Sequence, residues 1–241
     1  MPTTIILTGA AGDGDLANTA NYSPAQLPVN GDTLIVEENG EDFDANLDAL
    51  SGVTLAALVI RQSFTGTLGT ASEYFQVSPA VVRIGEHYGP GSRPGGSQRI
   101  MLDTESANST ITVFDSAAAS PSGDTDLPPI RLLVNGATAD LFVRKGKVGV
   151  ACVGATETAT LRNIDLGFVA SRDSDANLLL GPGVTWTAIT MSGGSCVVQS
   201  AGTSITRITT DAHSGSACAS VVCSSTDGSG VNFDLGSETF F

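Results

Sequence analysis

Basic residues are scarce in this chain of 241 residues, and their scarcity limits the partners it can have. Lysine and arginine together number 11 against 25 aspartates and glutamates, which gives a formal net charge of −14 at pH 7. Lysine occurs only as Lys145 and Lys147. A surface that binds nucleic acid needs a basic footprint to contact the phosphates. We therefore expect no nucleic-acid partner.

Long apolar runs are lacking as well. No stretch approaches the roughly 18 consecutive apolar residues that predict a membrane-spanning helix, so we expect no membrane partner. The first residues, Met1–Thr8, contain neither a basic segment nor the apolar run of a secretion signal. We expect the chain to be made in a cytoplasm and not to be exported by the secretion machinery.

Motifs for metals and cofactors are missing. The histidines and cysteines, which show no C-x₂-C pair and no zinc-type spacing, are His87, His213, Cys152, Cys196, Cys218 and Cys223. Asp13 and Asp15 lack the further spacing of a calcium loop, and no phosphate-binding glycine motif is present. We predict no metal and no cofactor. The cysteines are interpreted as small apolar thiols in a core, with a Cys218–Cys223 disulfide or cross-links between subunits as alternatives.

Catalytic constellations are also missing. The carboxylate pairs available for glycoside hydrolysis are Asp103 with Glu105 and Asp173 with Asp175. With one tryptophan and three tyrosines, a long sugar-binding groove would lack its usual stacking surfaces. Neighbouring carboxylates in an acidic chain are more often solvated loop residues. We predict no catalytic residues and no enzymatic activity.

Glycine, serine and threonine are abundant, and the apolar residues occur in short runs between them. The chain has 28 glycines, yet its hydrophobic fraction of 41% is that of a globular protein. The runs that we interpret as strands are 33–36, 53–60, 81–84, 100–102, 110–114, 130–134, 141–144, 148–152, 160–164, 177–180, 184–187, 196–198 and 205–209. Runs this short, rich in branched residues and separated by turn formers, predict an all-β protein.

The spacing of these runs favours a solenoid. In the second half, one series of runs begins near Leu141, Leu161, Leu178 and Val197, and a second passes through Val148, Leu166, Val184 and Ile205. Intervals of nearly twenty residues in two interleaved series are typical of coils that each contribute several short strands. We predict a right-handed parallel β-helix. The alternative is an antiparallel β-sandwich, whose strands also recur at short intervals.

The chain divides into two predicted parts. Residues 1–32 are expected to form an N-terminal cap or arm, and residues 33–241 the β-helix domain. Two stretches, near 87–98 and 115–129, are too rich in proline, glycine or small polar residues to hold a strand ladder. We expect them to protrude as loops, where contacts with partners tend to concentrate.

Residues 9–36, which include the first predicted strand, resemble the entry segment of β-helix proteins of tailed bacteriophages and of some bacterial surface proteins. The residues that carry the resemblance are Asn21, Tyr22, Ser23, Pro28, Gly31, Asp32, Leu34 and Val36. Tyr22 stands where that family often has tryptophan. Residues 47–60 also look like the first full coil of such proteins. The resemblance covers about 60 residues and implies a β-helix whose first coil is closed by a polar cap.

Two groups of residues are candidate contacts with a partner. Arg144, Lys145 and Lys147 form a basic cluster in an otherwise acidic chain, which suits an acidic partner or a neighbouring subunit, although a solvated turn is the alternative. Phe240 and Phe241 end the sequence, and they either cover the open end of the core or insert into a neighbour.

These observations together suggest a structural part of a particle. Our leading hypothesis is a bacteriophage virion protein, a capsid decoration protein on the capsid exterior that forms a homotrimer and binds the major capsid protein or other virion proteins. A tail fibre or spike component that binds a host surface glycan, with or without hydrolase activity, is the first alternative. A bacterial adhesin-like surface protein is the second.

Overall fold

A computed structural model describes residues 2–38, 40–86, 99–105, 108–116, 127–167, 176–191, 195–199, 208–210 and 220–223. Nearly all regular structure in these residues is β-strand, with one short 3₁₀ turn, η1 (Thr19–Asn21). The prediction of an all-β protein is therefore confirmed. The loop predicted at 87–98 and most of the loop predicted at 115–129 lie outside the described residues, as do Phe240, Phe241 and Cys218.

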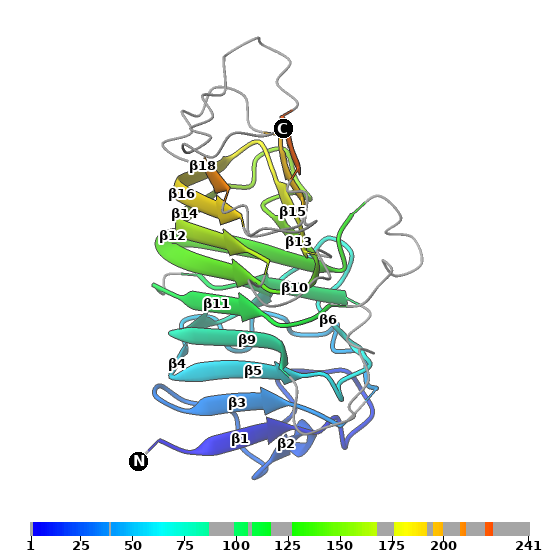
Figure 1. The fold of residues 1–241 in the computed structure, drawn as a ribbon. Helices are drawn as coiled ribbons and strands as arrows, with labels where there is room; N and C mark the ends of the chain where they lie inside the picture. Colours follow the sequence, from blue (N-terminus) through cyan, green and yellow to red (C-terminus); the bar gives the residue numbers. More distant parts are fainter. Residues whose placement is uncertain are drawn as a thin grey trace.

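The strands stack in two parallel ladders, and the chain passes from one to the other as it climbs (Figure 1). The first ladder contains β1 (Thr4–Leu7), β3 (Thr33–Val36), β5 (Ala57–Arg61), β9 (Val81–Glu86), β11 (Thr110–Val113), the second half of β12 (Ile130–Val143), β14 (Ala159–Leu166), β16 (Val184–Met191) and β18 (Ile208–Thr210). The second ladder contains β6 (Thr67–Leu68), β7 (Phe75–Gln76), β10 (Arg99–Asp103), the first half of β12, β13 (Gly146–Val150), β15 (Ala176–Leu180), β17 (Ser195–Val198) and β19 (Ser220–Cys223).

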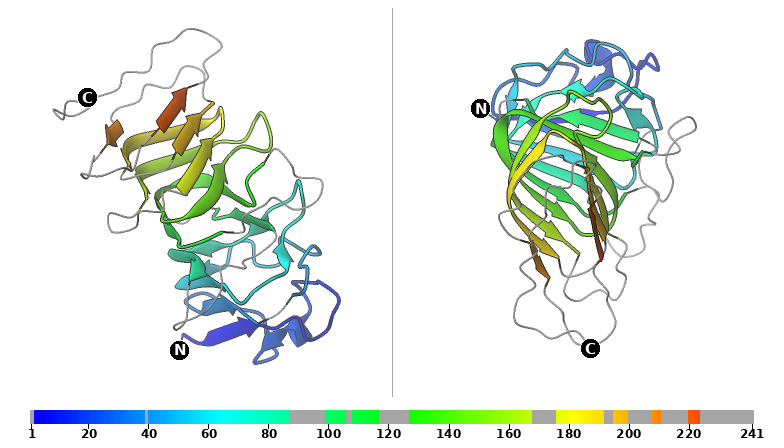
Figure 2. Two further views of the ribbon diagram at one scale, coloured as in Figure 1. Left: turned by 45° about the vertical axis from the view of Figure 1, so that its right-hand side comes forward. Right: turned by 90° about the horizontal axis from the view of Figure 1, so that it is seen from above.

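A third, short pairing joins β4 (Thr54–Leu55) to β8 (Ser78–Pro79), again in parallel. Among the described residues, the antiparallel pairing is that of β1 with β2 (Tyr22–Ser23), at the N-terminal end. Parallel pairing between successive coils is what a β-helix requires, and the view along the stack shows the two ladders as separate walls (Figure 2). The parallel β-helix is confirmed, and the antiparallel β-sandwich is wrong.

Apolar side chains stack in columns along the inner face of each ladder. In the first ladder one column runs through Ile5, Leu34, Leu58, Val82, Ile111, Leu141, Ile164 and Ile189. In the second, the column runs through Leu68, Ile100, Ile130, Val148, Leu178 and Cys196. All of these residues are buried. Branched side chains suit such columns because each packs against a similar apolar side chain on the neighbouring strand.

The stacking intervals differ from the predicted ones. Val148 lies over Ile130, 18 residues away, whereas Leu178 lies over Val148 at an interval of 30. Leu161 belongs to the first ladder and Leu178 to the second, so the first predicted series mixes the two ladders. The second series does the same, because Val148 belongs to the second ladder and Leu166 to the first. Both series are wrong, although the solenoid is right. The physical reason is that turns between ladders vary in length without disturbing the stack, since only the strands must be in register.

One long strand shows how the chain turns a corner of the coil. The first residues of β12 pair with β10 in the second ladder, and its last residues pair with β11 in the first. Register shifts against β14 occur on either side of Thr138 and Ala139, where the strand bends. β-Bulges allow such bending within a continuous strand. Two predicted strands, 130–134 and 141–144, are thus one.

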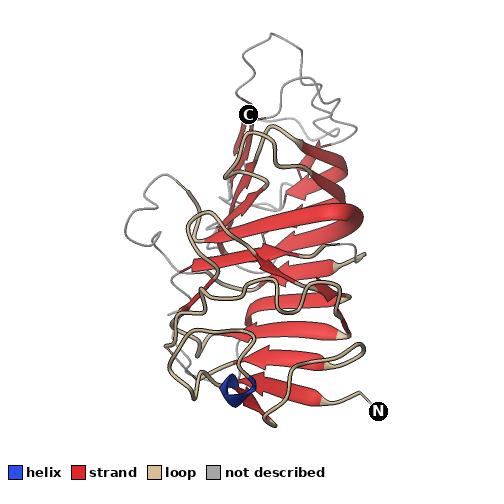
Figure 3. Ribbon diagram, turned by 180° about the vertical axis from the view of Figure 1, so that it is seen from behind, coloured by secondary structure: helices blue, strands red, loops and turns tan. Residues whose placement is uncertain are grey.

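The N-terminal end is closed by hydrogen bonds within residues 11–22. The side-chain amide of the buried Asn21 donates to Asp13 Oδ1 (2.7 Å) and to the Asp15 carbonyl (2.9 Å), and its Oδ1 accepts the Ala11 N–H (2.9 Å). The Tyr22 hydroxyl donates to the Leu16 carbonyl at 2.7 Å. η1 lies in this part of the chain (Figure 3). These bonds satisfy polar groups that the first coil of a stack would otherwise leave unpaired.

The boundary predicted at residue 32 divides elements that pack together. β1 lies within the predicted cap, yet it is already a parallel member of the first ladder, opposite β3. Asp32 fixes this junction, because its carboxylate accepts the N–H groups of Thr3 (2.7 Å) and Val29 (3.0 Å). These hydrogen bonds lower the pKa of Asp32, with the bond from Val29 contributing most. The first coil is therefore built from both sides of the boundary.

Candidate functional site

The predicted basic cluster lies where β12 gives way to β13, with Arg144 and Lys145 between the two strands and Lys147 within β13. Its three side chains have different surroundings. The Arg144 guanidinium lies 5.6 Å from the centre of the Phe142 ring and 3.8 Å from Asp165 Oδ1. Lys145 Nζ lies 3.8 Å from Asp115 Oδ2. The backbone N–H of Lys147 donates to Ser116 Oγ, and no described acidic residue pairs with its exposed side chain. Two of the three cations thus face carboxylates of the chain itself, which reduces the charge available to a partner.

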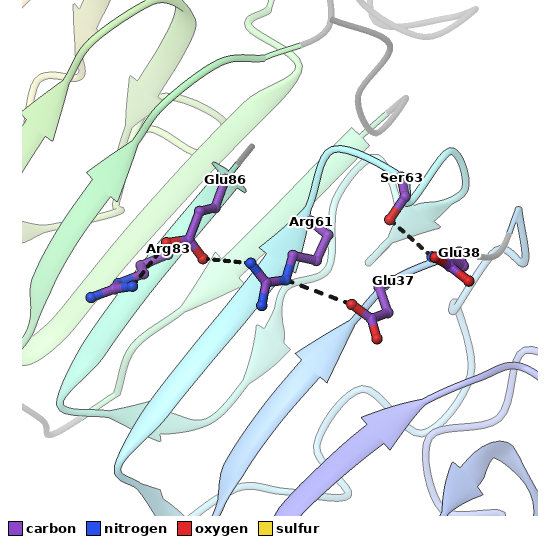
Figure 4. Close-up of polar contacts among 6 residues, drawn as sticks. All are labelled: Glu37, Glu38, Arg61, Ser63, Arg83 and Glu86. Atoms are coloured by element: carbon purple, nitrogen blue, oxygen red, sulfur yellow. Dashed lines mark hydrogen bonds and ion pairs between the residues drawn. The ribbon is translucent and has the colours of Figure 1, made fainter. Parts of the chain in front are cut away.

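A larger group of charged residues lies on the outer face, and its members also form ion pairs with one another. Arg61 at the end of β5 lies 3.0 Å from Glu86 of β9 and 3.6 Å from Glu37, which follows β3 (Figure 4). Glu86 also contacts Arg83 at 2.8 Å. These pairs connect three successive coils. Isolated surface pairs contribute little to stability, but a network that crosses coils reinforces their registration. This cluster is structural.

The described surface includes a hollow that sequence reasoning did not identify, a groove of about 590 Å³. Its lining residues are Asn46, Leu47, Asp48, Ser72, Glu73, Tyr74, Gln76, Asp103, Leu133 and Asn135. The lining therefore holds three carboxylates, three side-chain amides and no lysine, arginine or histidine. No sequence signal indicates such a site, because its members are spread over about 90 positions and meet only when the coils stack.

The groove follows a column of residues along the second ladder. The Gln76 N–H donates to the Leu47 carbonyl at 2.9 Å. Asp103 pairs with Gln76 on one side and with Leu133 on the other. Four successive coils thus each contribute one residue to the floor. With neighbouring strands about 4.8 Å apart, the floor extends over roughly 14 Å along the axis.

Asp103 is the most buried of the three carboxylates in the groove, with 7% of its surface exposed. Its Oδ1 accepts the Glu105 N–H at 2.8 Å and its Oδ2 accepts the Asn135 side-chain amide at 3.0 Å. Burial raises the pKa of Asp103, the nearby charge of Glu105 adds to this effect, and the two hydrogen bonds act against it. An acid with a raised pKa in a hollow is typical of functional sites, although structural networks produce the same shift.

Asp103 and Glu105, one of the two carboxylate pairs available for glycoside hydrolysis, do not both line the groove. Glu105 does not line the groove. Its carboxylate accepts hydrogen bonds from Ser51 Oγ (2.6 Å), the Gly52 N–H (2.8 Å) and Ser78 Oγ (3.3 Å). It therefore ties together coils that flank the short β4–β8 pairing. The second pair, Asp173 and Asp175, lies outside the described residues.

Tyr74 forms part of the groove wall but offers little aromatic surface. It is 8% exposed, and its hydroxyl donates to Glu157 Oε1 at 3.0 Å. Burial and the neighbouring Glu157 charge raise the pKa of Tyr74 far above its ordinary value. The second carboxylate oxygen of Glu157 accepts the Val153 N–H at 2.9 Å. Tyr74 is thus a fixed neutral phenol that holds two coils together.

Cys152 and Cys196 are present as thiols. Cys196 is buried in the second-ladder column, as the interpretation of small apolar thiols expects, and Cys152 is partly buried. Burial raises the pKa of Cys152 to about 11. Its sulfur is therefore protonated at neutral pH, and a protonated thiol is a poor nucleophile.

The raised pKa of Asp103 predicts a pH dependence of stability. Because folding disfavours the ionised form, the Asp103 contribution to stability is fully present below its unfolded pKa, about 3.9, and is lost as the pH rises through its higher folded pKa. Asp103→Asn removes the ionisable group and with it this dependence on pH. We expect the variant to become more stable relative to the wild type, in free energy of unfolding, as the pH rises from about 4 towards neutrality.

Denaturant unfolding of both proteins across this pH range measures the difference in unfolding free energy. Contributions from the carboxylates that both proteins contain cancel when one value is subtracted from the other. Asp13, Asp32 and Asp140, whose pKa values are lowered mainly by hydrogen bonds, act in the opposite direction in both proteins. A difference that stays constant with pH would contradict the prediction.

Within the described residues, no group of three or more histidine, cysteine, aspartate or glutamate side chains is placed to hold a metal ion. The same part of the chain contains no helix with the length and apolar character needed to span a membrane. Comparison of the chain with protein-family models, with curated proteins and with solved structures found no match.

Proposed function

We propose that the protein is a non-enzymatic structural component of a bacteriophage virion, a capsid decoration protein that forms a homotrimer on the capsid exterior and binds the major capsid protein. The observation that carries this proposal is the unbroken column of apolar residues from Ile5 to Ile189 in the first ladder. Such a stack makes a stiff body, because each coil is fixed by its neighbours on both sides.

The closed N-terminal end supports the same proposal. Asn21, Tyr22 and Asp32, which carry the resemblance to phage virion β-helices, make the hydrogen bonds that close the first coil. A closed end prevents further strands from adding to the stack. A straight ladder face is a surface on which identical copies can pack around a threefold axis.

Copy number tests the proposal. Quantitative gel densitometry of purified virions, calibrated against the major capsid protein, is expected to give hundreds of copies per particle, because a decoration protein follows the symmetry of the capsid lattice. A single-digit count would end the capsid assignment. A tail fibre or spike component, the alternative placement, would give a few to a few dozen copies.

Incubation of the purified protein with host polysaccharide is expected to release no shorter fragments.

A further inference from the structure

The chemistry of the groove restricts what can occupy it. Asp48, Glu73 and Asp103 contribute three carboxylates, and the residues that line the hollow include no base to balance them. Asp48 and Glu73 are exposed at the rim, whereas Asp103 lies in the floor. A ligand that brings positive charge relieves the repulsion among these groups, whereas a neutral ligand leaves it in place.

The remaining lining residues indicate a ligand that also donates hydrogen bonds. Asn46, Gln76 and Asn135 supply side-chain amides, and Ser72 supplies a hydroxyl, all of which can accept from an ammonium or guanidinium group. A sugar would instead gain most from an exposed aromatic platform. The aromatic residue of the groove, Tyr74, is 8% exposed and fixed by its bond to Glu157.

The shape of the groove favours an extended chain over a compact ion. Its floor follows Leu47, Gln76, Asp103 and Leu133 along the axis. An extended peptide advances about 3.3 Å per residue, so roughly four residues match the length of the floor.

We propose that this groove binds an extended basic segment of a partner protein, whose lysine or arginine side chains pair with Asp48, Glu73 and Asp103. That the partner is a virion protein rests on the proposed function, whereas the basic chemistry of the segment rests on the groove alone. The site is separate from the basic turn at Arg144–Lys147, which the sequence had indicated.

The test uses the full chain and a defined probe, a fluorescent, end-blocked peptide of four lysines, in buffer of about 0.15 M ionic strength. The double variant Asp48→Asn/Glu73→Gln removes two exposed charges from the rim and is expected to weaken binding about tenfold or more in fluorescence anisotropy. The matched control is Glu38→Gln/Asp44→Asn, which removes two exposed charges outside the lining. Thermal melting checks that both variants are folded.

Several results would overturn the proposal. Equal losses in the two double variants would mean that the peptide follows overall charge and not the groove. Undiminished binding of the peptide by the rim variant would exclude the site. Binding of a neutral N-acetylglucosamine tetramer without binding of the peptide would exclude it as well. Virion copy number is measured separately, so hundreds of copies together with an unaffected rim variant would contradict the groove assignment alone. A single-digit count would contradict the capsid role, whatever the peptide does.

Discussion

Substitution of Gly85 by alanine is expected to lower the free energy of unfolding by about 3–5 kcal/mol. Gly85 has a φ of +69°, and a Cβ built on it would lie 2.0 Å from the Asp115 carbonyl oxygen. The left-handed backbone costs a residue with a Cβ about 1–2 kcal/mol. The clash adds a further cost because the atom in the way is backbone of the next coil, which cannot move without disturbing the stack.

The conformation of Gly85 follows from its place in a bulge. Ile60 pairs with Ile84 and Arg61 pairs with Glu86, so Gly85 is the extra residue of β9. Glycine at a positive φ is the usual residue at such a position. The bulge brings Glu86 to Arg61 and Arg83 (Figure 4). A change at Gly85 should therefore also disturb the charge network that crosses the coils.

Chemical denaturation measures the effect of Gly85→Ala, and Gly12→Ala is the matched control. Gly12 has a similar φ of +66°, but a Cβ there would meet nothing within 4 Å. The control is expected to lose about 1 kcal/mol from backbone strain alone. Equal losses at the two positions would show that close packing between coils contributes nothing at Gly85, contrary to the prediction.

Shortening Leu141 to alanine is expected to destabilise the protein by about 3–5 kcal/mol. Leu141 is fully buried in the middle of the first-ladder column, between Ile111 and Ile164. The substitution removes buried apolar surface and leaves a cavity. The neighbours cannot collapse into it, because their backbones are held at the spacing of the ladder.

Thr112→Ala is the control for Leu141→Ala. Thr112 lies on the neighbouring strand β11, on the outward-facing side and only partly buried. Its loss is expected to change the unfolding free energy by no more than about 0.5 kcal/mol. The two variants are compared by denaturant midpoint at constant slope. A loss below about 1 kcal/mol for Leu141→Ala would contradict the role assigned to the column.

The sequence indicated most strands because short branched runs have few other stable conformations. The predicted run 33–36 coincides with β3, and 110–114 differs from β11 by one residue. Strands of two residues, such as β6 and β7, were missed. Nothing local marks them, because their hydrogen bonds come wholly from the coils on either side.

Arg131 shows where local pattern fails. It stands between Ile130 and Leu132, which both face the core. Because side chains along a strand alternate between its two faces, the sequence pattern alone predicts that Arg131 is exposed to solvent. The structure buries it completely. Its Nε donates to the Pro128 carbonyl at 2.8 Å and its terminal nitrogen donates to the Ala71 carbonyl at 3.3 Å. Ala71 is 60 positions away in the sequence, and only the stacking of coils brings it there.

The sequence by itself determined the class of fold and the closure of its first coil, since both depend on local preferences: short branched runs between turn formers, and Asn21, Tyr22 and Asp32 in one polar segment. Only the tertiary structure decided which runs lie over one another, which charges neutralise each other and where the surface is hollow. The physical reason is that coils of 18 and of 30 residues both stack in register. A groove built from residues of four coils therefore has no counterpart in sequence order.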